Sequence, residues 1–358
     1  MKLHLITSMW PSKDNPISGI FVAEQASALV DAGHEVWVTV ASPSKKQWSV
    51  IEDIEPRFMR TLYLPTRFGT IHRVANTKVA ARVARWTLPR HEADAVIVHN
   101  QLPLGFCVPW WQTKEVPTAV VVHGAAPPLA AKGYANWLKQ HLPELGSNVN
   151  VIPVGTTLLP YLQQLGVRHD AVLGNGTNYA DVAQGSSVSK TVVCIANLHK
   201  EKGVDVLLSA FSHLDSLWQL RIVGDGPERA ALERQALALG LDRVEFLGRL
   251  EREATLKVLE HADLFALPSV RESFGLVFLE AAMRGIPAVG CLGTGAEEII
   301  RDGVSGKLVA QGDPLAVAEA LEQMHLNRDA WGAAARENAL GRTWERYNKE
   351  LLAILGVG

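Results

Sequence analysis

The feature that most constrains the fold of this chain is a repeated alternation of short, β-branched apolar runs with amphipathic helical patterns. Strands that alternate with helices favour parallel sheets, because two parallel strands need a long crossover that is usually a helix. The alternation runs through the first half of the 358-residue chain and starts again in the second half. We therefore predict an α/β protein with two doubly wound parallel-sheet domains in tandem.

The expected strands are short and are bounded by turn residues. In the first half they cover residues 2–8, 35–41, 95–99 and 118–123, and in the second half 191–197, 220–223, 244–247 and 263–267. Apolar residues at helical spacing indicate helices between them. The clearest stripes are Val22, Ala26, Leu29 and Val30, and then Val204, Leu207, Leu208, Phe211 and Leu214.

The second start of the pattern sets the predicted domain boundaries. We place the first domain at residues 1–178 and the second at 191–342. The segment 179–190 has Gly and Ser at its centre, which is typical of a linker. A last helix within 343–358 is expected to pack back on the first domain.

Composition is that of a soluble globular protein, with 47% hydrophobic and 20% charged residues. The three cysteines, Cys107, Cys194 and Cys291, have no C-x-x-C spacing, so a reducing, cytoplasmic location is expected. The chain contains no Asp-x-Asp, and no His, Cys and carboxylate cluster has metal-ligand spacing. We therefore predict a protein that needs neither a metal nor a cofactor.

The most specific motif is E-S-F-G-L-V-F-L-E, residues 272–280. Its two carboxylates, Glu272 and Glu280, lie at the start of an expected short helix. At about 1.5 Å per residue, the eight residues span about 12 Å, close to the reach from ribose to sugar across a diphosphate. A helix start offers free amides and a favourable dipole to an anion. Here those amides belong to Phe274, Gly275 and Leu276. The alternative is an exposed helix with two solvated glutamates.

This motif resembles the E-x7-E motif of family 4 retaining glycosyltransferases, and the similarity runs along nearly the whole chain. Residues 11–33 are similar to the opening of members that build bacterial surface polysaccharides, while 193–208 and 222–229 resemble donor-domain landmarks. The resemblance implies a GT-B fold, with two Rossmann-like domains that face a cleft. The first domain would bind the acceptor and the second the nucleotide sugar. It also implies that Glu280 binds the ribose, and that Glu272 with the neighbouring amides binds the sugar and distal phosphate.

The same resemblance assigns roles to residues outside this motif. Lys202 would bind the diphosphate and stabilise the charge on the leaving group, and would act with Glu272 and His123 as the catalytic set. Asn197, in the place of a family arginine, would bind the donor without a charge. His123 ends an expected strand and would face the donor sugar, and Gly19 would let backbone amides reach the phosphates. A structural role for the histidine and a solvated lysine are the alternatives.

The predicted function is thus metal-independent, retaining transfer of a sugar from a nucleoside-diphosphate donor to a glycan or lipid-linked acceptor in cell-surface polysaccharide or glycolipid synthesis. Two alternatives stay open. One is a GT-B nucleotide-sugar epimerase. The other is a binding module without catalysis, which the family residues missing at Asn197 and Ala126 would permit. The sequence does not identify the base, sugar or acceptor, although backbone contacts near residues 248–250 are candidates for reading the base.

A basic stretch, residues 57–91, contains no acidic residue. Part of it has helical periodicity, with Lys78, Arg82 and Arg85 on one face, and Ile71, Ala75, Val79, Val83 and Trp86 on another. Either this is a packed helix with a solvated basic side, or the basic face meets anionic lipid headgroups or a lipid-linked acceptor at the inner face of the membrane. Nucleic acid is not expected, because the pI is about 6.6 and no recognition motif accompanies the patch.

Overall fold

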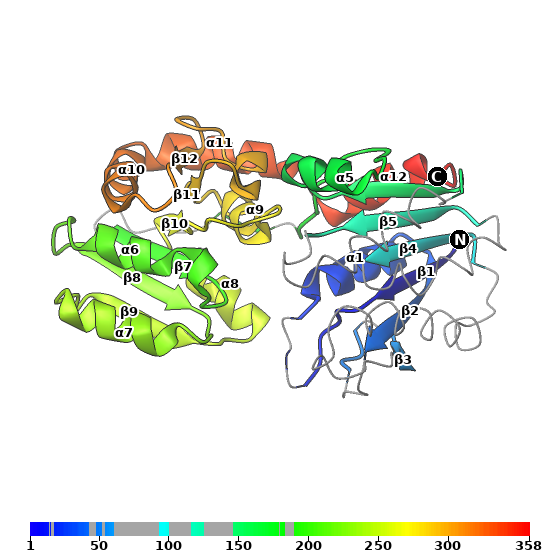
Figure 1. Cartoon of the computed structure of the whole chain (residues 1–358), viewed down its shortest axis with the longest axis horizontal. Coiled ribbons are helices and arrows are strands. Elements are labelled where there is room, and N and C mark those ends of the chain that lie inside the picture. Colours follow the sequence, from blue (N-terminus) through cyan, green and yellow to red (C-terminus); the bar gives the residue numbers. More distant parts are fainter. Residues whose placement is uncertain are drawn as a thin grey trace. The chain divides into compact units, whose positions relative to one another are not determined.

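The computed structural model describes residues 1–13, 15, 18–42, 48–51, 54–60, 93–99, 116–124, 146–178, 180–182 and 190–358. The chain divides into two compact units. Unit 1 comprises Met1–Gly176 and Trp344–Gly358, and unit 2 comprises Thr177–Thr343. Each unit holds a parallel sheet with associated helices (Figure 1).

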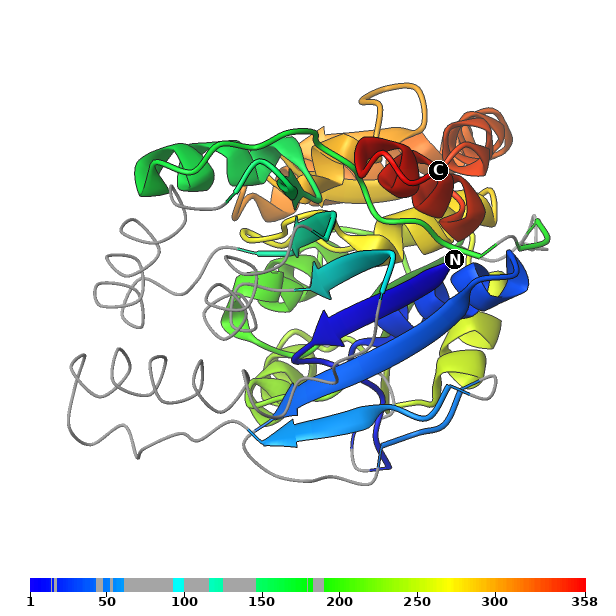
Figure 2. The same cartoon turned by 90° about the vertical axis from the view of Figure 1, so that its right-hand side faces the viewer.

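The sheet of unit 1 has six strands in the part of the chain that the structure describes, in the order β3-β2-β1-β4-β5-β6. The strands are β1 (Lys2–Thr7), β2 (Glu35–Ser42), β3 (Arg57–Arg60), β4 (Ala95–His99), β5 (Thr118–Val122) and β6 (Val149–Pro153). In Figure 2 the blue and cyan arrows of this sheet run in the same direction. Every residue of β4 and β5 is buried, which explains why four consecutive residues of each strand are apolar.

The last helix of the chain belongs to unit 1. The described helices of this unit are α1 (Ile20–Asp31), the 3₁₀ turn η3 (Thr156–Leu158), α5 (Leu159–Leu165) and α12 (Trp344–Ile354). The indole N–H of Trp344 donates to Glu24 Oε2 at 3.1 Å, and the amide of Asn348 donates to the carbonyl of Gln25 at 3.2 Å. These two bonds attach α12 to α1.

Unit 2 repeats the same architecture, with the sheet order β12-β11-β10-β7-β8-β9. Its strands are β7 (Lys190–Ile195), β8 (Trp218–Val223), β9 (Val244–Gly248), β10 (Leu264–Ala266), β11 (Ala288–Cys291) and β12 (Gly306–Val309). Its helices and 3₁₀ turns are η4 (Lys200–Lys202), α6 (Val204–Phe211), α7 (Arg229–Ala238), α8 (Arg252–Glu260), α9 (Leu276–Met283), η5 (Gly295–Glu298), α10 (Pro314–Leu326) and α11 (Arg328–Leu340).

Numbered within its own unit, each sheet has the strand order 3-2-1-4-5-6, which defines a doubly wound Rossmann-like domain. The predicted fold of two parallel α/β domains is confirmed. Strands β3, β6, β11 and β12 were not predicted; three of them have only four residues, too few for a clear alternation. In such sheets ligands bind outside the carboxyl ends of the strands where the order reverses. Those positions are β1 and β4 in unit 1 and β7 and β10 in unit 2.

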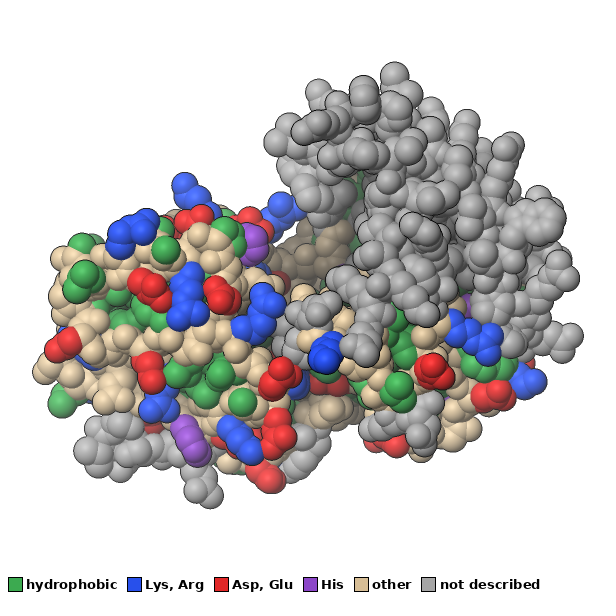
Figure 3. Space-filling model, turned by 90° about the horizontal axis from the view of Figure 1, so that it is seen from below, with side chains coloured by type: hydrophobic (Ala, Val, Ile, Leu, Met, Phe, Trp, Pro, Cys, Tyr) green, Lys and Arg blue, Asp and Glu red, His purple; other side chains and the backbone are tan. Residues whose placement is uncertain are grey.

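The basic stretch falls mostly outside the described residues. Of residues 57–91, only 57–60 are described, as β3, and the expected helix with its basic face is not among them. On the face drawn in Figure 3, acidic and basic side chains of the described residues are interspersed. None of the described helices combines the length and the apolar character that a membrane crossing requires.

Candidate active site

Lys202 lies in a tight turn that follows β7, at the point where the sheet order of unit 2 reverses. Gly203 comes next with φ 66°, a left-handed conformation that suits glycine. A Cβ on Gly203 would lie 2.1 Å from the carbonyl oxygen of Pro268, just beyond β10. The amide of Val270 also donates to the carbonyl of Glu201 at 2.9 Å. The turn after β7 therefore packs directly on the segment that leaves β10.

This packing brings Lys202 to Glu272, 70 residues further along the chain. The Lys202 Nζ donates to Glu272 Oε2 at 2.8 Å, and the two side chains are 21% and 17% exposed. Partial burial reduces the screening of this charge-assisted bond by solvent. Burial raises the pKa of Cys194 to about 12, and the positive charge of Lys202 opposes that shift. The ammonium thus lies near this thiol as well as beside the carboxylate.

The helix start that follows Glu272 is built on glycine. Gly275 is the N-cap of α9 with φ 77°, and no side chain caps the helix. A Cβ there would lie 2.5 Å from Phe278 Cδ2 and 3.1 Å from Glu272 Cγ. The left-handed residue precedes the helix, so α9 begins at Leu276, within the segment 274–276 where the helix start was expected. Helical rise therefore applies to only part of the segment between the two glutamates.

The loop before α9 is held by the turn that follows β11. The amide of Gly295 donates to the carbonyl of Glu272 at 2.8 Å. A Cβ on Gly295 would lie 2.3 Å from the backbone nitrogen of Phe274, whose side chain is buried. The position of Glu272 is thus fixed by close backbone packing on both sides of the motif.

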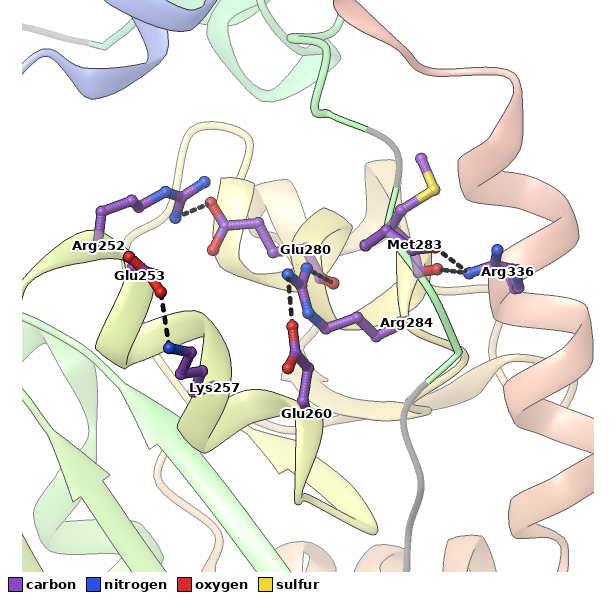
Figure 4. Close-up of polar contacts among 9 residues, drawn as sticks. Arg252, Glu253, Lys257, Glu260, Glu280, Met283, Arg284 and Arg336 are labelled. Carbon is purple, nitrogen blue, oxygen red and sulfur yellow. Dashed lines mark hydrogen bonds and ion pairs between the residues drawn. The ribbon is translucent and has the colours of Figure 1, made fainter.

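Glu280 is a buried residue of α9, with 5% of its surface exposed. Its Oε1 pairs with Arg252 Nη1 at 2.6 Å, and Arg252 is the first residue of α8 (Figure 4). Arg284 donates to the backbone carbonyl of Glu280 at 3.3 Å and pairs with Glu260 at 3.5 Å. Burial lowers the pKa of the Arg284 guanidinium, while the charges of Glu280 and Glu260 oppose that shift. Charges of alternating sign therefore join α8 to α9.

The other end of α9 is anchored by α11. Arg336 donates through Nη1 to the carbonyls of Met283 and Ala180, the latter at 2.7 Å (Figure 4). A cation at a helix C-terminus is favoured by the unpaired carbonyls and the dipole there. The helix that carries Glu280 is therefore fixed at both ends.

In unit 1 the ends of β4 and β5 present two histidines to each other. The distance from His99 Nδ1 to His123 Nε2 is 3.0 Å, and the rings are stacked. Burial lowers the pKa of His99 to about 3. Burial, and secondarily His99, holds the pKa of His123 well below its usual value. The pair is thus an uncharged hydrogen-bonding group at neutral pH.

Gly19 lies at the same edge of unit 1. It is the N-cap of α1 with φ 70°, and a Cβ there would lie 2.4 Å from the carbonyl carbon of Met9, after β1. Phe21, in the first turn of α1, packs on His123 with ring centroids 4.6 Å apart. The loop after β1 and the histidine after β5 are therefore neighbours through this ring.

The structure brings two of the predicted site residues of unit 2 into direct contact. Lys202 and Glu272 are in contact, and Gly275 and Leu276 follow directly at the start of α9. Asn197 lies exposed in the loop after β7. Among the residues described, no three His, Cys, Asp or Glu side chains are grouped as metal ligands would be.

Two residues at these edges were not predicted. His99 could have been found as a second strand-end histidine in the same sheet as His123. Arg252 has no such signal, because its partner is 28 positions away in another helix and only the packing of α8 on α9 joins them.

Comparison with known proteins identifies the class. The family model described as "Glycosyl transferase 4-like domain" matches residues 18–176, and the one described as "Glycosyl transferases group 1" matches residues 182–339. The chain thus carries both domains of family 4-type glycosyltransferases and belongs with them.

Among curated relatives, the chain is 35% identical over 174 residues to N-acetyl-alpha-D-glucosaminyl L-malate synthase of Bacillus anthracis. The match covers 46% of this chain and 43% of that protein, so it spans less than half the length of the relative.

Solved structures are similar over 99% of the chain. HepE of Anabaena, in complex with UDP and glucose, matches with a TM-score of 0.75 and 20% identity, over 99% of its own length. Sucrose-phosphate synthase of Thermosynechococcus elongatus matches with a TM-score of 0.79 and 19% identity, over 98% of its length. At this identity the likeness shows the fold, which is GT-B.

Proposed function

We propose that this protein is a retaining glycosyltransferase that moves a sugar from a nucleoside-diphosphate donor to a hydroxyl of a glycan or lipid-linked acceptor in cell-surface polysaccharide or glycolipid synthesis. Unit 2 would bind the donor and unit 1 the acceptor. The observation that carries the proposal is the Lys202–Glu272 pair at the reversal point of unit 2, beside a glycine-capped helix start. The solved structure of HepE, with UDP and glucose bound, supports a donor of this class.

Each group fits one part of such a donor. The Lys202 ammonium would meet the diphosphate and offset the charge that grows on it as the bond to the sugar breaks. The α9 start, with its amides and dipole, would bind the distal phosphate. Glu272 would accept hydrogen bonds from sugar hydroxyls and Glu280 from the ribose. Asn197 and the Gly19 loop would add uncharged contacts.

Retention would follow from attack on the face that the nucleotide leaves. The acceptor oxygen would form its bond to the anomeric carbon as the bond to the phosphate oxygen breaks, and a phosphate oxygen would take the acceptor proton. The uncharged His123 would donate a hydrogen bond to the sugar. We propose that lysine and helix-start amides supply the stabilisation of the diphosphate without a metal ion.

The test is a donor panel of UDP-, GDP- and ADP-sugars, with and without oligosaccharide and lipid-phosphate acceptors. We expect nucleoside diphosphate release that depends on an acceptor, and a product whose anomeric configuration by NMR is that of the donor. Release without an acceptor product would indicate hydrolysis. Interconversion of the donor sugars would indicate an epimerase, and donor binding without turnover a binding module. An inverted product would refute retention.

The peripheral membrane role of the basic stretch stays a prediction. Its residues 61–91 lie outside the described part of the chain. Co-sedimentation with vesicles of neutral lipid, and with vesicles that contain anionic lipid, separates the two interpretations. Equal and negligible binding to both would leave the solvated helix.

A further inference from the structure

The ion pair between α8 and α9 adds Arg252 to the candidate donor site. This residue lies outside the motifs identified in the sequence. Arg252 follows the loop after β9, where Gly248 has φ 71°. Its guanidinium Nη1 forms a short charge-assisted contact of 2.6 Å with Glu280 Oε1. The Glu280 side chain is 6% exposed and the Arg252 side chain 25% exposed. The Arg252 side chain thus stays partly accessible to solvent, whereas that of Glu280 is buried.

A buried carboxylate stays ionised only when a cation or hydrogen bonds compensate for the water it has lost. Arg252 supplies that compensation at Oε1. An ionised carboxylate has about four lone-pair positions, so a carboxylate that bonds to an arginine can also accept hydrogen bonds from hydroxyl donors. The same bond restrains the position of Oε1, since Arg252 comes from a different helix than Glu280.

We propose that Arg252 is a positioning residue for the nucleotide: it holds Glu280 ionised and oriented to accept hydrogen bonds from both vicinal hydroxyls of a ribose, and so makes the protein select ribonucleotide over 2′-deoxyribonucleotide donors. This inference rests on the proposed function, because it takes Glu280 to be the ribose-binding residue. A donor built on deoxyribose lacks one of the two hydroxyls. The carboxylate would then lose one charge-assisted bond, which corresponds to a roughly ten- to hundredfold weaker complex.

The geometry of α8 separates this role from simple helix packing. Glu260, at the far end of α8, pairs with Arg284, so α8 has a second ionic attachment to α9 (Figure 4). Removing Arg252 leaves that attachment in place. The substitution then removes the Arg252 contact of the Glu280 carboxylate. We expect it to weaken ribose binding more than it lowers the stability of the fold.

The experiment is isothermal titration calorimetry of the full-length protein with the pairs UDP and dUDP, GDP and dGDP, and ADP and dADP. We expect the best-bound wild-type ribonucleotide to bind roughly ten- to hundredfold more tightly than its deoxy partner. In Arg252→Ala the ribonucleotide should bind more weakly than to the wild type. The ratio of the deoxyribonucleotide Kd to the ribonucleotide Kd should fall to about threefold or less. Arg252→Lys, which restores one point charge, should recover part of the ratio.

Lys257→Ala is the matched control. Lys257 is a cation of the same helix, paired at 2.6 Å with Glu253 on the exposed side, and should keep the wild-type ratio (Figure 4). If circular dichroism shows that Arg252→Ala is unfolded, Arg252→Gln decides the same comparison.

Three outcomes would contradict either the role of Arg252 and Glu280 in ribose recognition or the proposed function itself. An unchanged ratio in a folded Arg252 variant would make the pair a packing contact only. Equal wild-type binding of ribo- and deoxyribonucleotides would refute ribose recognition by Glu280. If no nucleoside diphosphate binds the wild type at all, the proposed function itself fails.

Discussion

The two units have the same strand order and present their candidate residues at the same edges of their sheets, yet they present opposite chemistry. Unit 2 offers ion pairs, Lys202 with Glu272 and Arg252 with Glu280. Unit 1 offers His99 and His123, which burial keeps uncharged. The shared topology explains where the residues lie, and the loops after each strand determine what they can do. This contrast is what we expect if, as proposed, unit 2 binds an anionic nucleotide and the histidine pair of unit 1 meets hydroxyl groups.

The largest effect should come from removing the central cation of unit 2. We expect Lys202→Ala to lower kcat by about 10²–10³, the cost of losing one preorganised group that stabilises transition-state charge. The Glu272 carboxylate, 17% exposed, would also lose its partner at 2.8 Å. Steady-state kinetics with the preferred donor measure this. If kcat falls by less than about tenfold, the Lys202 ammonium does not stabilise the transition state.

Lys200→Ala is its control, since Lys200 is an exposed cation in the same short turn. Its kcat and KM should equal those of the wild type. A matching loss in both variants would point to the turn and not to the ammonium.

A smaller effect should separate two glycines that play equivalent parts in the two units. Gly19 and Gly275 are both left-handed N-cap residues of helices. Alanine at either should cost about 1–2 kcal/mol from the backbone conformation alone. At Gly19 the new Cβ meets the backbone of Met9 at 2.4 Å, whereas at Gly275 it meets the side chain of Phe278 at 2.5 Å. A side chain yields more easily than a backbone, so Gly19→Ala should lower Tm more.

Nucleotide affinity should show the reverse order. Alanine at Gly275 would also press on Glu272 Cγ at 3.1 Å, beside the candidate phosphate site. We expect Gly275→Ala to raise the donor Kd by more than Gly19→Ala does, as measured by calorimetry. The opposite order would place nucleotide recognition in unit 1 and undo the contrast between the units.

The smallest effect concerns pH and tests the uncharged pair. The folded-state pKa of His99 is lowered to about 3, below its ordinary value of 6.5. Between these values the unfolded chain binds a proton that the folded chain does not, so stability is complete above pH 6.5 and declines as pH falls. The decline is about 1.4 kcal/mol per pH unit for one histidine. In His99→Gln, Tm should therefore fall less between pH 7.5 and 5.5 than in the wild type.

His213→Gln, at an exposed histidine of unit 2, should keep the wild-type pH dependence of Tm. In activity, His123 should contribute no acidic limb between pH 8 and 6, because it stays neutral there. A decrease in activity near pH 6.5 that is lost in a His123 variant would show that His123 becomes charged. The contrast between the ion pairs of unit 2 and an uncharged histidine pair in unit 1 would then be wrong.

The sequence alone located most of the strands and the residues at their ends. The buried runs at β4 and β5 were readable because both faces of a central parallel strand are covered, so apolar residues continue without interruption. Short edge strands such as β12 were missed, since four residues do not establish a period. The start of α9 was located only to within two residues, because the sequence does not show that Gly275 is left-handed and precedes the helix.

The order of apolar runs and helices determined the double α/β architecture, and the spacing of Glu272 and Glu280 with their glycine determined where donor chemistry was to be sought. Only the tertiary structure decided which partner each carboxylate has. Lys202 reaches Glu272 because a glycine lets two turns touch, Arg252 reaches Glu280 because α8 packs on α9, and the two histidines meet because β4 and β5 are neighbours. Local periodicity follows from neighbouring residues, whereas these pairings join residues 24 to 70 positions apart and exist only once the chain has folded.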